Sequence, residues 1–501
     1  MSYVLLSVLL LPTLAVPFVY LVGRKSAKWA ALSVALISIV SLALILTTVP
    51  AIFGPDHKYV ETYTWIPVLN SKFTLFTDGI SISMAIITMV LMLSASLYSI
   101  NYMQGKKNLE IFYMLLTLLF VGLVGVFITS NLLFFYFCWE LMLVPSFFIV
   151  GNWGYRDSYK ASFKFFVFTH AGAVFVLLGI GAIYMTTNSI DLFQAEQLLL
   201  TKSPDLVRWI LLALTAGFAV KMALFPVHLW LPDAYSESPA PMSALLGGIL
   251  TSAGAYAIIR ISMETVFPAV IGTPFGTNFL HGLAVFGVIS AFFGSFIALS
   301  ETDLKRIIAY SSISHMGYIL FGVSLFYTSG GALLQVALAG TVLHIVTHGL
   351  SKGLFFLSAG SLMNSLSLRN IRDMGGIAGK MPITGAASAT AAFSLGGAPP
   401  FACFISEFFI FMGAFQMIPV DGFYIWPTAL MLLATVLSLG YSLRFISNVF
   451  LGPSKLGEIT KKSLEVPRFM LLGMIILTVL VVIVGIYPSL FMNLINSAIF
   501  I

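Results

Sequence analysis

The sequence predicts an all-α polytopic membrane protein with about fourteen transmembrane helices. First, 59% of the 501 residues are hydrophobic and only 9% are charged, whereas soluble domains carry about 25% charged residues. Second, apolar runs of about 20 residues, long enough to span a bilayer, recur from end to end. Third, basic residues are concentrated in alternate loops, as the positive-inside rule requires.

The predicted spans cover residues 2–23, 29–53, 74–100, 111–129, 131–150, 160–186, 206–230, 241–263, 277–299, 306–327, 331–363, 382–417, 426–449 and 467–493. The runs 331–363 and 382–417 are too long for simple helices and contain glycines, so we expect bends or breaks in both. No polar insertion is large enough for a second domain. The chain 1–501 is therefore expected to form a single membrane domain.

Lys and Arg gather in one set of loops. That set holds seventeen of them: Arg24, Lys25, Lys28, Lys106, Lys107, Arg156, Lys160, Lys164, Lys305, Arg306, Arg369, Arg372, Lys380, Lys455, Lys461, Lys462 and Arg468. The opposite loops hold only Lys58, Lys72, Lys202, Arg208 and Arg260. Basic loops stay cytoplasmic, so both termini are expected outside. The basic residues form no patch that could follow a phosphate backbone, and nucleic acid is not expected as a partner.

The cysteine content argues against a redox cofactor in this chain. Cys138 and Cys403 are the two cysteines, and both fall inside predicted spans. An iron–sulfur cluster usually needs four thiolates, and there is no glycine-rich nucleotide fingerprint. We therefore expect neither a cofactor nor a catalytic residue here.

The informative residues are ionisable groups inside spans, each of which costs about 2.5–3.5 kcal/mol at a helix centre. They are Glu140, Lys221, His315, His344, His348, Lys352 and Glu407. Three of them, His344, His348 and Lys352, are spaced four residues apart and share one helix face. Chains of Glu, Lys and His within membranes mark proton relays.

Plainer interpretations exist for individual residues. A lone buried histidine is often structural, and Glu140 with Lys221 could form an ion pair that only locks two helices. The His344/His348 spacing fits zinc, but no third ligand stands nearby in sequence. The number of ionisable groups, spread over about five spans, favours a relay over packing or metal binding.

Prolines accompany two of these residues. Pro226 follows Lys221, and Pro399 with Pro400 precedes Glu407. Proline removes a helix hydrogen bond, and paired interrupted helices are typical of inverted-repeat transporters. We expect broken helices at the seventh and twelfth spans and two inverted five-helix repeats, 111–263 and 277–449. Three helices in 1–105 precede them, and one in 467–501 follows.

Five motifs carry a resemblance to a known family: "FCWELMLVPSFF" (137–148), "KMALFPVHLWLPDAYSESPAP" (221–241), "DLKRIIAYSSISHMGY" (303–318), "THGLSKGLFFLSAGSL" (347–362) and "SLGGAPPFACFISEFF" (394–409). They resemble the antiporter-like proton-translocating membrane subunits of respiratory complex I, of membrane-bound hydrogenases and of Mrp-type antiporters. The resemblance runs from about residue 75 to 450. It implies fourteen spans, two inverted repeats and a central polar axis.

The resemblance also implies roles for the site residues. Glu140 and Lys221 match the family's ion pair, and His315, His344 and His348 match its histidines. Glu407 matches a twelfth-helix residue that is Glu in the complex I subunit 4 branch. The implied partners are other membrane subunits, including related antiporter-like ones, and iron–sulfur peripheral subunits, in the lipid bilayer of the cell membrane or an equivalent energy-transducing membrane.

One position departs from the family pattern, because Ser252 stands where relatives usually carry an eighth-helix lysine. Water held by Ser252 and Thr251 could bridge this gap, or Lys352 could serve as the central station. The predicted function is a proton-translocating subunit of a redox-driven complex, which Glu407 favours. The alternatives are a subunit of a Mrp-type Na⁺/H⁺ antiporter and a structural spacer, which only Ser252 supports.

Overall fold

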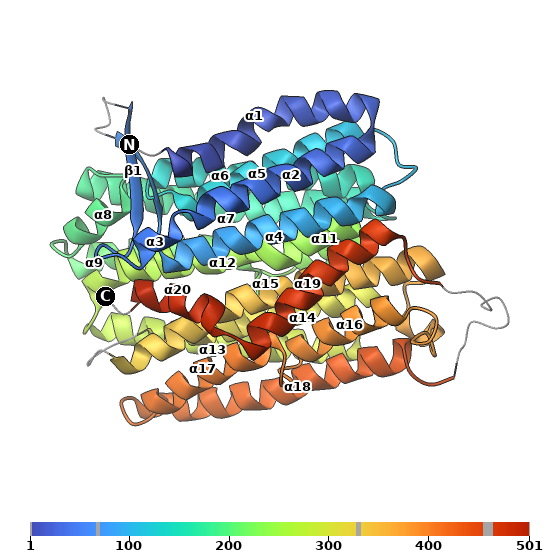
Figure 1. Ribbon diagram of the computed structural model, residues 1–501. Coiled ribbons are helices and arrows are strands. Elements are labelled where there is room, and N and C mark those ends of the chain that lie inside the picture. Colours follow the sequence, from blue (N-terminus) through green and yellow to red (C-terminus); the bar gives the residue numbers. More distant parts are fainter. Residues whose placement is uncertain (1–2, 67–70, 327–331, 454–463, 500–501) are drawn as a thin grey trace.

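The computed structural model describes residues 3–66, 71–326, 332–453 and 464–499. Its long helices lie side by side with their axes roughly aligned (Figure 1). Within the described ranges, twelve helices are long and apolar enough to cross a membrane. The prediction of a mainly helical polytopic membrane protein is therefore confirmed.

The elements in chain order are α1 Val4–Lys25, α2 Ala27–Leu46, α3 Val49–Ile52, β1 Tyr59–Ile66, β2 Ser71–Thr77, α4 Gly79–Tyr102, α5 Leu109–Ile128, α6 Leu132–Trp153, α7 Ser158–Thr187, α8 Leu192–Leu199, α9 Pro204–Met222, α10 Leu231–Glu237, α11 Ala240–Leu245, η2 Leu246–Leu250, α12 Thr251–Ala257, η3 Ile258–Val266, η4 Phe267–Val270, α13 Pro274–Ser300, α14 Leu304–Ser324, α15 Ala332–Leu366, η5 Ile371–Asp373, α16 Pro382–Leu395, α17 Ala402–Met417, η6 Gly422–Tyr424, α18 Ile425–Val449, α19 Arg468–Ile486 and α20 Ser489–Ile499. The eighth predicted span comprises α11, α12 and the π-helical segments η2 and η3.

The two predicted helix breaks are present. The run 206–230 consists of α9 followed by non-helical residues 223–230, which contain Pro226. The run 382–417 consists of α16 and α17, separated by residues 396–401, which contain Pro399 and Pro400. The count of fourteen spans and the inverted repeats 111–263 and 277–449 stay predictions.

A bend or a break was expected within 331–363, and the structure has no break there, because α15 is one continuous 35-residue helix. Its glycines serve close packing instead. A methyl group at Gly349 would lie 2.5 Å from the carbonyl oxygen of Gly248 in η2. Only glycine at both positions lets these two backbones touch, so Gly349 marks a helix crossing.

A β-hairpin that was not predicted lies between the second and third spans. Strands β1 and β2 pair antiparallel, with Tyr59 opposite Thr77. The predicted span 74–100 therefore begins late, at Gly79, where the Asp78 side chain accepts hydrogen bonds from the N–H groups of Ile80 and Ser81. The hairpin also holds α1, because the Glu61 carboxylate accepts hydrogen bonds from two N–H groups in the first turn of that helix, where negative charge is stabilising.

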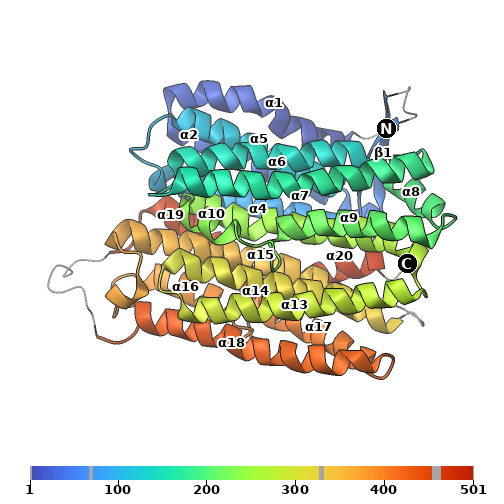
Figure 2. The same cartoon turned by 180° about the vertical axis from the view of Figure 1, so that it is seen from behind.

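The bundle has a buried centre and lipid-facing edges. The eighth span and α15 are the most deeply buried, followed by α14, α4 and α5, whereas α1, α7, α18 and α19 are mostly exposed. Figures 1 and 2 place α5–α7 toward one edge of the bundle and α13, α17 and α18 at the other, with α4, α12 and α15 between them. The deeply buried helices α12, α14 and α15 carry five of the eight predicted proton-path residues, namely Ser252, His315, His344, His348 and Lys352.

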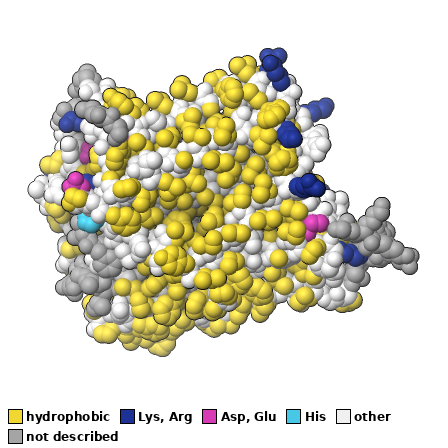
Figure 3. Space-filling view, viewed as in Figure 1, with side chains coloured by type: hydrophobic (Ala, Val, Ile, Leu, Met, Phe, Trp, Pro, Cys, Tyr) yellow, Lys and Arg dark blue, Asp and Glu magenta, His cyan; other side chains and the backbone are white. Residues whose placement is uncertain are grey.

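The two ends of the bundle differ in charge. Figure 3 shows an apolar band across the face, with exposed Lys and Arg gathered at one end. The two ends of the chain lie together at the opposite end (Figure 1). This arrangement agrees with an even number of crossings. We call the end rich in Lys and Arg the basic end.

Arg260, which the charge count assigned to a loop, is buried. Arg260 lies in η3, its side chain is 9% exposed, and it forms ion pairs with Asp78 at 2.5 Å and Glu264 at 2.7 Å. The pair with Asp78 joins the eighth span to the start of α4. Hydropathy could not detect it because the two residues are 182 positions apart.

Replacing Arg260 with Met should destabilise the protein strongly. The substitution leaves the buried Asp78 carboxylate and the partly exposed Glu264 carboxylate without their ion-pair partner, and breaking a buried pair costs about 3–5 kcal/mol. The thermal unfolding midpoint of the detergent-solubilised protein should fall clearly. The matched control is Arg208→Met, which removes an exposed pair with Asp205 and should change little. Equal midpoints for the two variants would contradict the structural role of Arg260.

Candidate functional site

The second half of the chain brings three predicted residues together. His315 of α14, His344 of α15 and Glu407 of α17 each offer one ligand-type atom, and these atoms lie within 4.8 Å of one another. His315 Nδ1 is 3.2 Å from His344 Nε2 and 4.0 Å from Glu407 Oε1. The three side chains converge from three helices in the protein interior.

The hydrogen bonds around the histidines share one direction. The Ser406 hydroxyl donates to the carbonyl of Cys403, so His344 Nδ1–H donates to Ser406 Oγ. His344 Nε2 then accepts from His315 Nδ1–H, and His315 Nε2 accepts from the Tyr441 hydroxyl. This assignment of hydrogens satisfies both rings in their neutral form. If donor and acceptor exchange roles in each of these hydrogen bonds, the net result is the transfer of one proton from one end of the series to the other.

Glu407 borders both this series and the protein surface. It lines a groove of about 550 Å³ between α17 and α18 with Phe404, Phe408 and Gly397. Its Oε1 atom has no hydrogen-bond partner among the described residues. Gly397 lies in the break before α17 at φ +66°, where an added methyl group would meet Glu407 Oε2 at 2.6 Å. The helix break therefore makes room for the carboxylate.

Lys352 and His348 extend the series along α15. The ring centroid of His348 is 5.5 Å from that of His315, and its two nitrogens have no partner among the described residues. Lys352 Nζ donates to the carbonyl of Ile308 at 3.0 Å and to the hydroxyl of Ser311. Lys352 thus contacts α14 one turn before His315.

Glu140 and Lys221 do not form the expected ion pair. Among the described residues no contact within 4.0 Å joins them. Glu140 Oε2 instead lies 3.3 Å from His170 Nδ1 of α7. Lys221 is buried at the end of α9, with its ammonium group 5.1 Å from the Trp139 ring centroid. Trp139 adjoins Glu140, so the two residues remain neighbours on facing helices.

Ser252 lies in the fully buried helix α12. Its hydroxyl donates to the carbonyl of Gly248 at 3.2 Å. Gly349, the residue after His348, packs against the same carbonyl oxygen. On its other side α12 packs on α9, where a methyl group at Gly254 would lie 2.9 Å from the Met222 nitrogen. The Ser252 helix therefore lies between Lys221 and the histidines.

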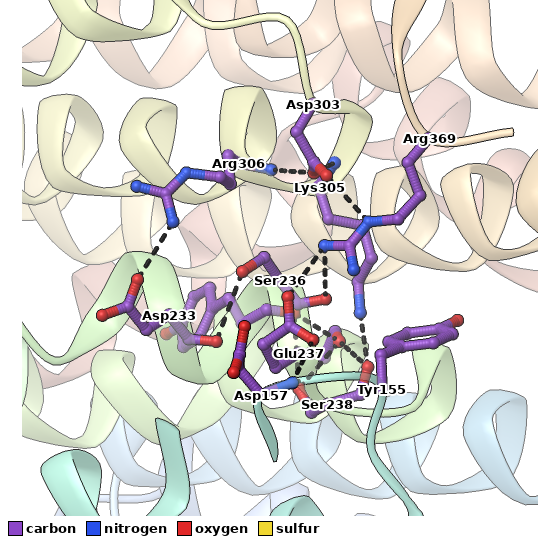
Figure 4. Close-up of polar contacts among 12 residues, drawn as sticks. Tyr155, Asp157, Asp233, Ser236, Glu237, Ser238, Asp303, Lys305, Arg306 and Arg369 are labelled. Carbon is purple, nitrogen blue, oxygen red and sulfur yellow. Dashed lines mark hydrogen bonds and ion pairs between the residues drawn. The ribbon is translucent and has the colours of Figure 1, made fainter. Parts of the chain in front are cut away.

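A network of ion pairs closes the basic end (Figure 4). Asp233 of α10 pairs with Lys164 and Arg306, and Arg369 pairs with Glu237 and Asp303. These pairs connect the segment after the break in the seventh span to α14 and to the loop after α15. They fix the position of α10 relative to the second half.

Glu301 extends the network through Arg306. Burial alone raises the pKa of the Glu301 carboxyl. The backbone N–H groups of Thr302 and Asp303, together with Arg306, outweigh burial, so this pKa lies below its usual value. The carboxyl is therefore charged and keeps Arg306 occupied.

Several residues of the site were not predicted from the sequence. His170 falls inside the predicted span 160–186, so a complete list of ionisable residues inside the spans would have included it. Lys305 was counted as a loop charge, yet it is fully buried in the first turn of α14. Tyr441 and Ser406 carry no charge, and only the fold reveals their contact with the histidines.

The family model described as "NADH:quinone oxidoreductase/Mrp antiporter, TM" matches residues 129–437. The NADH-quinone oxidoreductase subunit M of Pseudomonas aeruginosa is 35% identical over 478 residues, covering 92% of this chain and 89% of that protein. The F(420)H(2) dehydrogenase subunit M of Methanosarcina mazei is 32% identical over 441 residues, covering 86% and 84%.

Solved structures share the fold. A chain of the archaeal membrane-bound sulfane sulfur reductase matches with a TM-score of 0.85 at 22% identity, covering 99% of this chain and 97% of that one. A chain of respiratory complex I from Thermus thermophilus matches with a TM-score of 0.84 at 21% identity, covering 99% of both chains. The resemblance carried by the motifs is confirmed. The chain belongs to the NADH:quinone oxidoreductase/Mrp antiporter transmembrane family, as an antiporter-like membrane subunit.

Proposed function

We propose that this subunit moves protons through the buried chain of Glu, Lys and His residues. The observation that carries the proposal is the directed series Tyr441–His315–His344–Ser406 beside Glu407. An imidazole can accept a proton on one nitrogen and release one from the other, which makes it suited to a relay. A structural spacer has no need of such a series.

Electron transfer is assigned to partner subunits. Both cysteines of this chain are buried, and two thiolates do not hold a four-ligand cluster. The relatives named NADH-quinone oxidoreductase subunit M and F(420)H(2) dehydrogenase subunit M support a redox-driven complex. The proposed partners are related antiporter-like membrane subunits and iron–sulfur peripheral subunits. The proposed location is an energy-transducing membrane, with both termini outside.

The function can be tested on the purified complex. Affinity purification through this subunit should recover iron–sulfur proteins. In proteoliposomes with a pH-sensitive dye inside, electron transfer should drive proton movement. Electron transfer without proton movement through an intact complex would contradict the proposal. Purification without iron–sulfur proteins, together with Na⁺-dependent proton exchange, would favour the Mrp-type alternative supported by the Mrp complex of Dietzia, a structural neighbour with a TM-score of 0.84.

Ser252 provides a test of the connection between the two halves. Ser252→Leu should slow proton movement several-fold, because the larger apolar side chain excludes water, which needs two to four polar partners to stay. Ser252→Ala should be nearly silent, because Thr251 and backbone carbonyls remain. Proton uptake in proteoliposomes, normalised to assembled complex, measures both. A wild-type rate for Ser252→Leu would mean that the path bypasses the eighth span, leaving Lys352 as the central station.

A further inference from the structure

Lys305 is a buried lysine that the relay described above does not use. Its side chain is fully buried although it stands at the basic end. Its Nζ atom donates to the carbonyl of Ser238 at 2.5 Å and lies 5.1 Å from the Tyr155 ring centroid. Figure 4 shows the side chain running from α14 toward Ser238. No carboxylate of the described residues forms an ion pair with it.

The acidic groups around Lys305 are already paired with arginines. Arg369 holds Asp303 and Glu237, while Arg306 holds Asp233 and Glu301. Burial disfavours the charged form of an amine unless a free carboxylate compensates. Lys305 therefore differs from its neighbours in the network, because no partner fixes its proton.

Lys305 lies between a cavity and the interior. A cavity of about 640 Å³ at the basic end is lined by Tyr155, Pro239 and Arg369, and Tyr155 contacts Lys305 from that side. On the inner side, Ser238 Oγ is 2.9 Å from Ser243 Oγ.

The polar contacts continue toward the eighth span. The Tyr235 hydroxyl oxygen lies 3.2 Å from Thr251 Oγ1, and Thr251 precedes Ser252. Polar groups thus occur at intervals from the cavity to the position where relatives carry a lysine.

We propose that Lys305 takes up protons from this cavity and passes them toward Ser252. The neutral amine forms an N–H bond with a proton from cavity water. The ammonium group then releases that proton, through water and the Ser238–Ser243 hydroxyls, and returns to the neutral amine. No electrons are exchanged. This inference rests on the proposed function and supplies a substitute for the missing eighth-helix lysine.

Lys305→Arg separates proton transfer from structure. Arginine keeps the positive charge, a donor for Ser238 and the contact with Tyr155, but it does not deprotonate in proteins. We expect assembled complex whose proton translocation falls by about tenfold or more. The control is Lys160→Ala at the same end, whose side chain is 87% exposed, and it should translocate normally. Wild-type translocation by Lys305→Arg would overturn the inference and leave the function intact.

Lys305→Ala provides a second measurement that does not depend on how arginine fits. Methylamine or ethylamine added on the side of the basic end can enter the cavity and occupy the vacated space. If Lys305 carries protons, these amines should restore translocation, and the restored rate should depend on the pKa of the amine. A structural role would predict restoration independent of amine pKa. Such an outcome, or no loss in Lys305→Ala, would also overturn the inference.

Discussion

Glu407→Gln should abolish most proton translocation while leaving the complex assembled. Glutamine keeps the size and the hydrogen-bonding capacity of the side chain but cannot titrate. Because Glu407 is the only carboxylate of the described residues beside His315, its loss removes the acidic member of the series. Loss of a required proton carrier slows transfer by about 10²-fold or more. Dye-monitored proton uptake in proteoliposomes measures the effect.

Glu407→Asp is the matched variant, because it retains a titratable group on a shorter side chain. It should keep part of the activity, since the groove of about 550 Å³ beside Glu407 leaves space for water to bridge the added distance. Equal rates for the Gln and Asp variants would show that Glu407 is not a proton exit group. Its role would then be limited to packing against Gly397.

Lys221→Ala should produce a loss of similar size in the first half. The substitution removes the buried amine at the end of α9, just before the break, and the loss expected for a proton carrier is about 10²-fold. Glu140 should keep its contact with His170, so the variant should assemble. The measurement is proton translocation normalised to the amount of intact complex.

Two comparisons sharpen this prediction. Lys160→Ala, at an exposed position, should translocate at the normal rate. Glu140→Gln should have a weaker effect than Lys221→Ala, because Glu140 is partly exposed and pairs with His170 rather than with Lys221. If Lys221→Ala translocates normally, the buried lysine serves only to pack against Trp139, and the first half has no relay at this position.

Much of the architecture could be predicted from the sequence because hydropathy and proline act locally. The breaks at Pro226 and at Pro399–Pro400 follow from the missing N–H donor. Apolar runs located the spans, but they could not distinguish the strand at residues 71–77 from the start of α4. They also could not show that the glycines of α15 face another backbone, since that depends on Gly248, about one hundred residues earlier in the chain.

The site was predictable where charge appears inside an apolar run, as for His315 and Glu407. It was not predictable where charge lies near the end of a run. Arg260 and Lys305 look like loop residues in sequence, and only tertiary contacts with Asp78 or Ser238 bury them. The contact between Glu140 and His170 likewise depends on how α6 and α7 face each other.

The continuity of α15 has a mechanical consequence. His344, His348 and Lys352 are carried by one unbroken helix, with successive residues about 6 Å apart along its axis. A rotation or slide of this rod displaces all three side chains at once against α14 and α17. A movement of the helix therefore changes their contacts in concert. Glu407 lies on a different helix, α17, which begins after the break at residues 396–401, so a movement of α15 changes the position of all three side chains relative to this carboxylate.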